Sequence, residues 1–337
     1  MKHFLCCLSF LLIVIRLSAQ PHLAIHPIQL PEDIAYYDNQ YSSLYIAHDS
    51  LYLMSESRLE DNAEAFLSSA SLNDLKKAVD DSMYHTPFIK IPIYNLDIVR
   101  TKMNSEGQSY EGLEAMVIKN NTVYLSIETA TPSDYCYLIK GHLENNKINI
   151  DTSKLFKLAK PMDNAGQHIY NAGYEALEII KDKLYAFFEY NYFPAHNNVI
   201  CIDTSLSKAA ETKPINKWPF RITDVSNVPH KNYMIGINFF YNGEGKDEIY
   251  RVPTGDTANF PLTQGATGFR SYCRLIKITF NGKIFFSKPF ITLPDLYWGY
   301  NWEGLAAYNS GFFIINDKYT PHRPYRTTLS YLEIKND

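Results

Sequence analysis

A unit of four short apolar segments recurs along the chain, and this repeat limits the possible folds more than any other feature. Three copies open with similar phrases, YEGLEAMVIKNNTVYLSIET (110–129), YEALEIIKDKLYAFFEY (174–190) and NWEGLAAYNSGFFIIND (301–317). Each phrase is an apolar run, a polar turn and a second apolar run, which predicts a β-hairpin. Two weaker copies begin at Tyr41 and Arg221, so five hairpins are expected.

A third apolar segment follows each hairpin, and a fourth segment carries a proline. The prolines of the fourth segments are Pro27, Pro92, Pro161, Pro214 and Pro289. Proline within a sheet favours an edge strand, where its missing N–H breaks no ladder bond. Four strands repeated in this order are typical of β-propeller blades.

The two ends of the chain predict how the propeller closes. The chain stops after a third segment, and it begins, after residue 20, with a proline-bearing segment, HLAIHPIQLP. We therefore predict an all-β fold, a five-bladed β-propeller over residues 21–337 in which the N-terminal strand completes the last blade. Long linkers at 58–95 and 242–270 leave a six-bladed propeller as the alternative. They are expected to hold one helix at 72–83 and an extra hairpin around DEIYRV.

The first twenty residues, MKHFLCCLSFLLIVIRLSAQ, have a basic start, an apolar run and a small-residue end. This pattern predicts a signal peptide, residues 1–20, and hence an exported protein, periplasmic or secreted. An uncleaved anchor is the alternative. The full chain has a net charge of −4. The mature chain is expected to insert in no membrane, to bind no nucleic acid and to be a monomer.

Three cysteines of the mature chain, Cys136, Cys201 and Cys273, occupy similar positions in three successive third segments. Equivalent positions in neighbouring blades are too far apart for a disulfide. We predict buried thiols.

Acidic residues recur at both ends of the hairpins. In an antiparallel hairpin the start of the first strand lies beside the end of the second. The predicted starts are Ser42, Glu111, Glu175, Thr223 and Glu303, and the predicted ends are Glu56, Glu128, Glu189, Asn238 and Asp317. Because the first strand of each blade lines the central channel, these side chains are expected to meet at one channel mouth.

Crowded carboxylates cannot all remain ionised unaided. They can share protons, pair with basic residues, or bind a hard cation, for which Ca²⁺ is the best candidate. A purely structural role, with hydrogen bonds between neighbouring blades, is the alternative. The candidate metal ligands are Glu56, Glu111, Glu175 and Glu303.

Further candidates lie around the same mouth. The possible catalytic groups are Glu128, Glu189, Asp317, His196 and His322. The possible ligand-binding groups are Arg58, Arg221, Arg323 and Tyr192. The histidines can equally be exposed loop residues, and the tyrosine can be ordinary packing.

At these phrases the sequence resembles the secreted bacterial phytase-like propellers, described as having esterase-like activity of phytase, and the related SdiA-regulated propellers. The resemblance implies export and calcium-assisted hydrolysis of phosphate or carboxylate esters. It carries over to Glu111, Glu175 and Glu303, with Glu128, Glu189 and Asp317 at the second-strand ends. The first and fourth hairpins depart from it, with Ser42 and Thr223 in place of the acid.

The sequence contains no G-x-S-x-G, H-E-x-x-H or Gly-rich phosphate-loop motif. The leading functional prediction is therefore a channel mouth that binds a divalent cation and a small molecule or glycan. Such a site would hydrolyse an ester, phosphoester or lactone. A non-catalytic binding or interaction propeller is the alternative.

Overall fold

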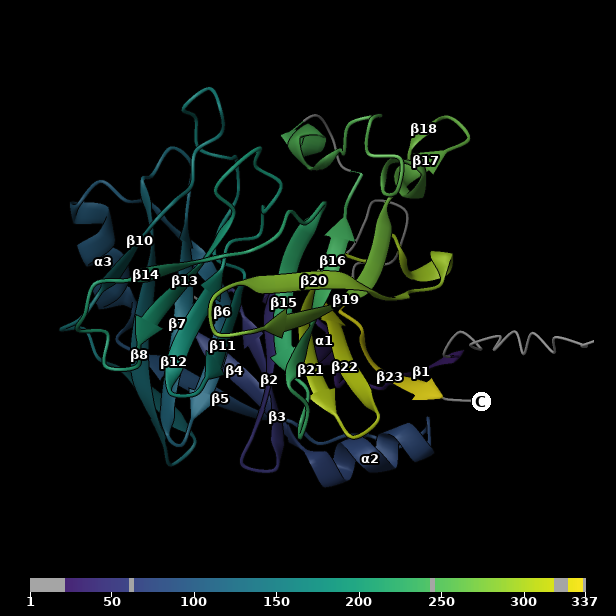
Figure 1. The fold of residues 1–337 in the computed structure, drawn as a ribbon. Coiled ribbons are helices and arrows are strands. Elements are labelled where there is room, and N and C mark those ends of the chain that lie inside the picture. The colour runs from purple at the N-terminus through teal and green to yellow at the C-terminus, as the bar shows by residue number, and fades with distance from the viewer. Residues whose placement is uncertain (1–21, 61–63, 243–245, 318–326, 336–337) are drawn as a thin grey trace, which may run out of the picture.

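The computed structural model describes residues 22–60, 64–242, 246–317 and 327–335. Within these residues the strands form five units around a common axis (Figure 1). The first unit contains β2 (Tyr41–Ala47), β3 (Ser50–Ser55), β4 (Phe66–Ser71) and β5 (Ile89–Tyr94). The second contains β6 (Tyr110–Lys119), β7 (Thr122–Thr129) and β8 (Tyr135–Glu144), with β9 (Lys147–Ile150) and β10 (Phe156–Ala159) both paired to β8.

The remaining three units have four strands each. The third contains β11 (Ala176–Ile180), β12 (Lys183–Phe187), β13 (Asn198–Asp203) and β14 (Glu211–Pro214). The fourth contains β15 (Arg221–Asn227), β16 (Tyr233–Phe240), β19 (Tyr272–Phe280) and β20 (Phe285–Thr292). The fifth contains β21 (Trp302–Tyr308), β22 (Gly311–Asn316), β23 (Leu329–Lys335) and β1 (His22–Ile28).

The N-terminal strand closes the ring, as predicted. Strand β1 pairs antiparallel with β23, from His22 opposite Lys335 to Ile28 opposite Leu329. The innermost strands β2, β6, β11, β15 and β21 contact one another in a closed cycle, β21 returning to β2. The fold is therefore a β-propeller whose described residues form five blades. Strand β5 also pairs in parallel with β9 and so joins the outer edges of the first two blades.

The long linkers form helices and short turns among the described residues. The first linker contains α2 (Leu72–Asp80), which confirms the helix predicted at 72–83. The Ser71 hydroxyl caps the first turn of α2 by accepting from the Asp74 N–H. The prediction of a hairpin around DEIYRV is wrong, because the 3₁₀ helix η3 (Lys246–Tyr250) lies there. The second linker does form a hairpin further along the chain, between β17 (Gln264–Gly265) and β18 (Gly268–Phe269). The other helices are α1 (Glu32–Ala35), α3 (Leu96–Ser105), η1 (Tyr37–Asn39), η4 (Phe260–Thr263) and η5 (Asp295–Tyr297).

The inner hairpins turn tightly at polar residues with left-handed backbone. Positive φ angles occur at His48, Asn120, Lys181 and Asn309, the first residues of four of these turns. Backbone of this kind matches the twist of the flanking strands. The turns therefore fix the register that brings each strand start to the channel mouth.

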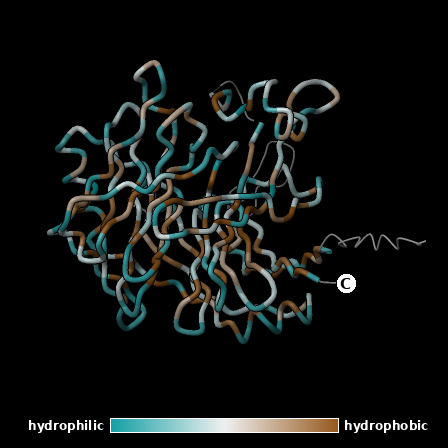
Figure 2. The backbone as a smooth tube through the Cα atoms, viewed as in Figure 1, coloured by the Kyte–Doolittle hydropathy of each residue, from teal (hydrophilic) through white to brown (hydrophobic). Residues whose placement is uncertain are grey.

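Apolar side chains fill the spaces between neighbouring blades, and the hydrophilic segments lie mainly in the outer loops (Figure 2). The inner strands approach closely at Gly304, where an added Cβ would lie 2.6 Å from Ile315 Cγ2 and 2.9 Å from the Leu44 backbone nitrogen. Only glycine fits there. The three cysteines are buried and form no disulfide, which confirms that prediction.

The predicted signal peptide, residues 1–20, lies outside the described residues. Among the helices that the structure describes, none combines the length and apolarity needed to cross a bilayer.

Candidate metal centre at the channel mouth

A cavity of about 100 Å³ lies at one mouth of the channel and is lined almost wholly by polar side chains. We call it the acidic cavity. Its lining residues are Glu56, Arg58, Glu114, Glu128, Asn171, Glu175, Glu189, Arg221, Asn301, Glu303 and Asp317. Seven of these are carboxylic acids and two are arginines, so the predicted convergence of acids at one mouth is what the structure contains.

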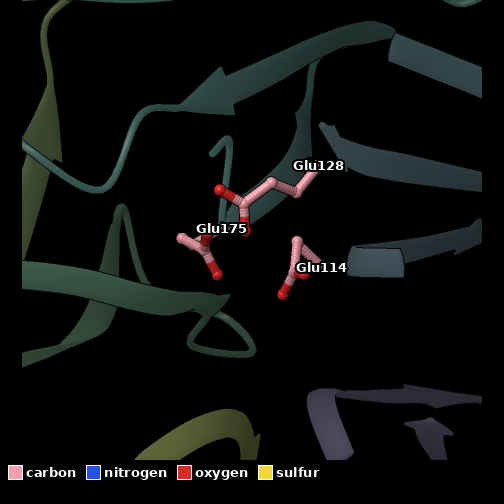
Figure 3. Close-up of side chains that lie close together, drawn as sticks. All are labelled: Glu114, Glu128 and Glu175. Atoms are coloured by element: carbon pink, nitrogen blue, oxygen red, sulfur yellow. The ribbon is translucent and has the colours of Figure 1, made fainter. Parts of the chain in front are cut away.

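Three of the carboxylates converge most closely. One oxygen each from Glu114, Glu128 and Glu175 lies within 4.8 Å of the others, and all three side chains are buried. Figure 3 shows their carboxylates pointing toward one another from the second and third blades. Such a group presents only oxygen donors, which hard cations prefer.

The structure places Glu114, and not Glu111, at the strand position equivalent to Glu175 and Glu303. Counting from the turns gives the same answer, because Ser42, Glu114, Glu175 and Glu303 each lie six residues before the first left-handed turn residue. Strand β6 has a register irregularity at Glu114, between Leu113 and Ala115, as β2 and β21 have at Ser42 and Glu303. Glu111 lies three residues earlier on the strand and does not line the acidic cavity.

The two hydroxyl residues at this position bind neighbouring blades. Ser42 Oγ donates to the Leu113 carbonyl at 2.7 Å, and Thr223 Oγ1 donates to the Trp302 carbonyl, also at 2.7 Å. A purely structural role, with hydrogen bonds between neighbouring blades, therefore describes Ser42 and Thr223. The acidic residues at the equivalent positions face the cavity instead.

Two guanidinium groups compensate part of the negative charge. Arg58 Nε contacts Glu56 Oε2, and an Arg221 guanidinium nitrogen lies 3.4 Å from Glu189 Oε2. Among the described residues that line the cavity, these two arginines are the basic ones, and they pair with Glu56 and Glu189. Crowded carboxylates beyond such pairs are stabilised by protonation or by a cation.

Burial and mutual repulsion raise the proton affinity of the other carboxyls. Burial raises the pKa of the Glu114 carboxyl well above its usual range, and the neighbouring Glu175 and Glu56 raise it further. The pKa values of Glu175 and Glu303 are raised for the same reasons, with Arg221 opposing the shift. Burial also raises the pKa of Glu128, to about 8, although the Lys160 ammonium acts against this shift.

Glu128 also carries an unsatisfied oxygen. Glu128 is only 4% exposed, and its Oε1 has no hydrogen-bond partner within the part of the chain that the structure describes. A buried acceptor without a donor is costly. A cation at this point would satisfy the oxygen and remove the repulsion at the same time.

Several residues that complete this mouth were not predicted from the sequence. Tyr250, from the long insertion between β16 and β19, donates its hydroxyl to Glu189 Oε1, and its ring lies 4.2 Å from the Arg221 guanidinium carbon. Asn171 and Asn301 line the cavity, and Asn301 Nδ2 donates to Asp317 Oδ2 at 3.3 Å. No short motif marks these residues, because they come from loops.

Other predicted residues are not brought into the cavity. His196 is exposed in its loop, and Tyr192 donates to Asp256 Oδ2 at 2.9 Å, outside the cavity lining. Asn238 does not line the cavity, and its side chain accepts from Arg274 Nε at 2.8 Å, which links β16 to β19 within the fourth blade. His322 and Arg323 lie outside the described residues.

Comparisons with known proteins support the fold. No family model matches the chain, and no curated protein matches it in sequence. Among solved structures, an exo-β-1,3-galactanase from Phanerochaete chrysosporium is similar with a TM-score of 0.51 and 9% identity over 93% of this chain and 66% of that chain. At 9% sequence identity, this similarity shows a shared fold alone.

Two further solved structures have lower TM-scores. A GH43 β-xylosidase/α-arabinofuranosidase from a compost microbial metagenome, in a calcium-free form, has a TM-score of 0.46 and 8% identity over 94% of each chain. A DUF4221 protein from Bacteroides vulgatus has a TM-score of 0.46 and 10% identity over 95% of this chain and 98% of that chain.

Proposed function

We propose that this protein binds a divalent cation, Ca²⁺, in the acidic cavity at the channel mouth. The observation that carries the proposal is the convergence of Glu114, Glu128 and Glu175, with oxygens within 4.8 Å of one another and one Glu128 oxygen unsatisfied. The second and third blades together supply this donor set.

The donor set suits calcium better than magnesium, because its oxygens come from an irregular group of side chains. Three oxygens within 4.8 Å of one another leave a point at most about 2.8 Å from each, which accommodates calcium–oxygen bonds of 2.3–2.6 Å. Magnesium requires about 2.0–2.1 Å and near-ideal octahedral geometry. Glu303 and the side-chain oxygens of Asn171 and Asn301 supply further donors in the same cavity.

The test is calcium titration of the mature chain after removal of metal with EDTA, followed by calorimetry and by thermal unfolding. We expect the unfolding midpoint to rise with Ca²⁺ concentration, because the ion binds only the native state. Mg²⁺ at equal concentration should raise it less. Glu128→Gln and Glu175→Gln should each weaken Ca²⁺ binding tenfold or more, since each removes a charged donor.

The matched control is Asp182→Asn, which neutralises an exposed carboxylate in the hairpin turn of the third blade, at the opposite end of β11 from Glu175. It should bind Ca²⁺ as the unmodified protein does. An unfolding midpoint that EDTA and Ca²⁺ leave unchanged would contradict the proposal, as would full affinity in both glutamine variants.

A second candidate function is hydrolysis at the same site. The specific observation is that a carboxyl with a pKa of about 8, Glu128, shares a cavity with Glu56 and Glu189, whose carboxylates each pair with a guanidinium group. A protonated and an ionised carboxyl side by side are the acid and base that cleavage of glycosidic and ester bonds requires. The GH43 neighbour's name describes a β-xylosidase/α-arabinofuranosidase, and this chemistry fits a glycosidic bond as well as the predicted esters and lactones.

Aryl glycosides, aryl esters and aryl phosphates in parallel assays separate these substrate classes. We expect turnover of uncharged substrates, because the excess of carboxylates repels phosphate monoesters. Turnover that survives in both Glu128→Gln and Glu189→Gln would exclude this site as its source. Calcium binding without any turnover would favour the non-catalytic binding propeller.

A further inference from the structure

A second cavity, of about 330 Å³, adjoins the acidic cavity. We call it the side cavity. Glu56 and Arg58 line both cavities. The acidic cavity, at about 100 Å³, has room for an ion and a few waters, whereas small-molecule sites begin near about 300 Å³. A small molecule that meets the channel-mouth carboxylates therefore has its room in the side cavity.

The wall of the side cavity contains an unsatisfied amide. Gln40 is only 7% exposed and lines this cavity, and its Oε1 has no hydrogen-bond partner among the described residues. An acceptor buried without a donor carries a free-energy penalty that a ligand hydroxyl would remove. This observation is independent of the acidic cavity.

The backbone around the side cavity is held in an unusual shape. Gln40, Ser57 and Leu59 all line it and have φ angles of 44°, 50° and 59°. The Gln40 carbonyl accepts from the Glu56 N–H at 2.8 Å. The Ser57 carbonyl accepts from the Tyr110 hydroxyl at 2.7 Å, and the Leu59 carbonyl accepts from an Arg100 guanidinium nitrogen at 2.7 Å. Surroundings that fix such backbone are common at ligand sites.

The side chains of the wall combine aromatic surface with hydrogen-bonding groups. Tyr36 and Phe66 supply aromatic rings, Asp38 and Gln40 supply acceptors, and Arg58 supplies donors. Carboxylates outnumber the single guanidinium, since Glu56, Glu60 and Glu64 line the cavity as well. This balance repels anions, and the aromatic rings suit the C–H faces of a ring-shaped ligand.

We propose that the side cavity binds a neutral, hydroxyl-rich ring of monosaccharide size. Its hydroxyls donate to Gln40 and Asp38, Arg58 donates to a ligand oxygen, and one face of the ring lies against Tyr36. Only the placement of a reactive bond beside Glu56 rests on the proposed channel-mouth function. Binding of the ring itself does not require the cation.

The experiment is saturation-transfer NMR and calorimetry of the mature chain with D-galactose, D-xylose and L-arabinose at millimolar concentrations. D-galacturonate and D-glucosamine serve as anionic and cationic probes of the same size. We expect the neutral sugars to bind and the anion to bind at least tenfold more weakly. Tyr36→Ala and Gln40→Met should each weaken binding of the neutral sugars fivefold or more.

The control is Tyr94→Ala, because Tyr94 is as exposed as Tyr36, 49% against 52%, and lies outside the side cavity. It should leave sugar binding unchanged. Binding of the amine alone, no binding of any neutral sugar, or full affinity in Tyr36→Ala and Gln40→Met would each overturn the proposal. Glu175→Gln separates the two proposals, since it should weaken Ca²⁺ binding tenfold or more and preserve sugar binding.

Discussion

At the scale of single residues, Glu114 and Glu111 offer the sharpest contrast in the molecule. They lie three positions apart on one strand, yet Glu114 is buried in the acidic cavity and Glu111 does not line it. The phrases YEGLEA and YEALEI suggest that Glu111 matches Glu175. The observed register instead matches Glu114-Ala115 with Glu175-Ala176, each alanine facing the second strand.

The pair gives a direct test of the proposed cation site. Glu114→Gln should weaken Ca²⁺ binding tenfold or more in calorimetry, because it replaces a charged donor by a neutral amide. Glu111→Gln, the same chemical change on the same strand, should alter the affinity less than about twofold, since Glu111 is only half-buried and does not line the cavity. Equal losses in the two variants would place the ion along the strand instead of in the cavity.

At the scale of elements, the insertion between β16 and β19 contributes most to the shape of the site. Its Tyr250 and Val252 are buried in a core cluster that extends from the second to the fourth blade, where the Tyr250 ring packs edge-on against Tyr190. The Tyr250 hydroxyl donates to Glu189, and the Tyr250 ring lies over the Arg221 guanidinium group. The insertion therefore closes one side of the channel mouth and holds the ion pair of Glu189 with Arg221 in place.

Removal of the Tyr250 hydroxyl measures this contribution. Tyr250→Phe should lower the free energy of unfolding by about 1.5–3 kcal/mol, the usual range for a hydrogen bond to a charged group, measured by urea denaturation. Tyr192→Phe is the matched control, because its hydroxyl bonds to Asp256, which is less buried, and its loss should cost less than about 1 kcal/mol. A Tyr250→Phe variant no less stable than Tyr192→Phe would show that the insertion does not anchor the site.

At the scale of the whole molecule, closing the ring forces acids from every blade but the fourth into one small volume. Without a cation, the folded protein must hold protons on them that the unfolded chain would release. The carboxyls of Glu114, Glu128, Glu175 and Glu303 all have raised pKa values in the fold. Stability of the metal-free protein should therefore depend on pH.

The sign follows from the raised pKa values. Below the ordinary glutamate value of 4.5 both states hold these protons, and the stabilisation is fully present. As pH rises from there through about 8 for Glu128, the unfolded state binds fewer protons and stability falls, by at most about 1.4 kcal/mol per pH unit for each carboxyl. Thermal unfolding in EDTA between pH 5 and pH 8 measures the effect.

Two comparisons identify the source of this pH dependence. Glu128→Gln should show a shallower fall than the unmodified protein, because one titrating group is gone. Saturating Ca²⁺ should reverse the fall, since the ion binds the deprotonated carboxylates and its affinity rises with pH. A metal-free protein that becomes more stable between pH 6 and pH 8 would contradict protonated carboxyls in the cavity.

The sequence by itself determined the blade repeat, the closing N-terminal strand and the meeting of acids at one mouth. These features depend on strand periodicity, proline placement and polar turns, which are local and visible in the letters. The positions of Glu175 and Glu303 followed as well, because each lies six residues before a short polar turn. The similarity of the phrases YEGLEA and YEALEI misplaced the equivalent acid of the second blade at Glu111, although Glu114 lies six residues before its own turn.

Only the tertiary structure decided which loop residues complete the cavity. Tyr250, Asn171 and the side cavity come from loops whose paths depend on packing against distant blades. A loop path is set by the sum of many long-range contacts, and a single sequence does not display that sum.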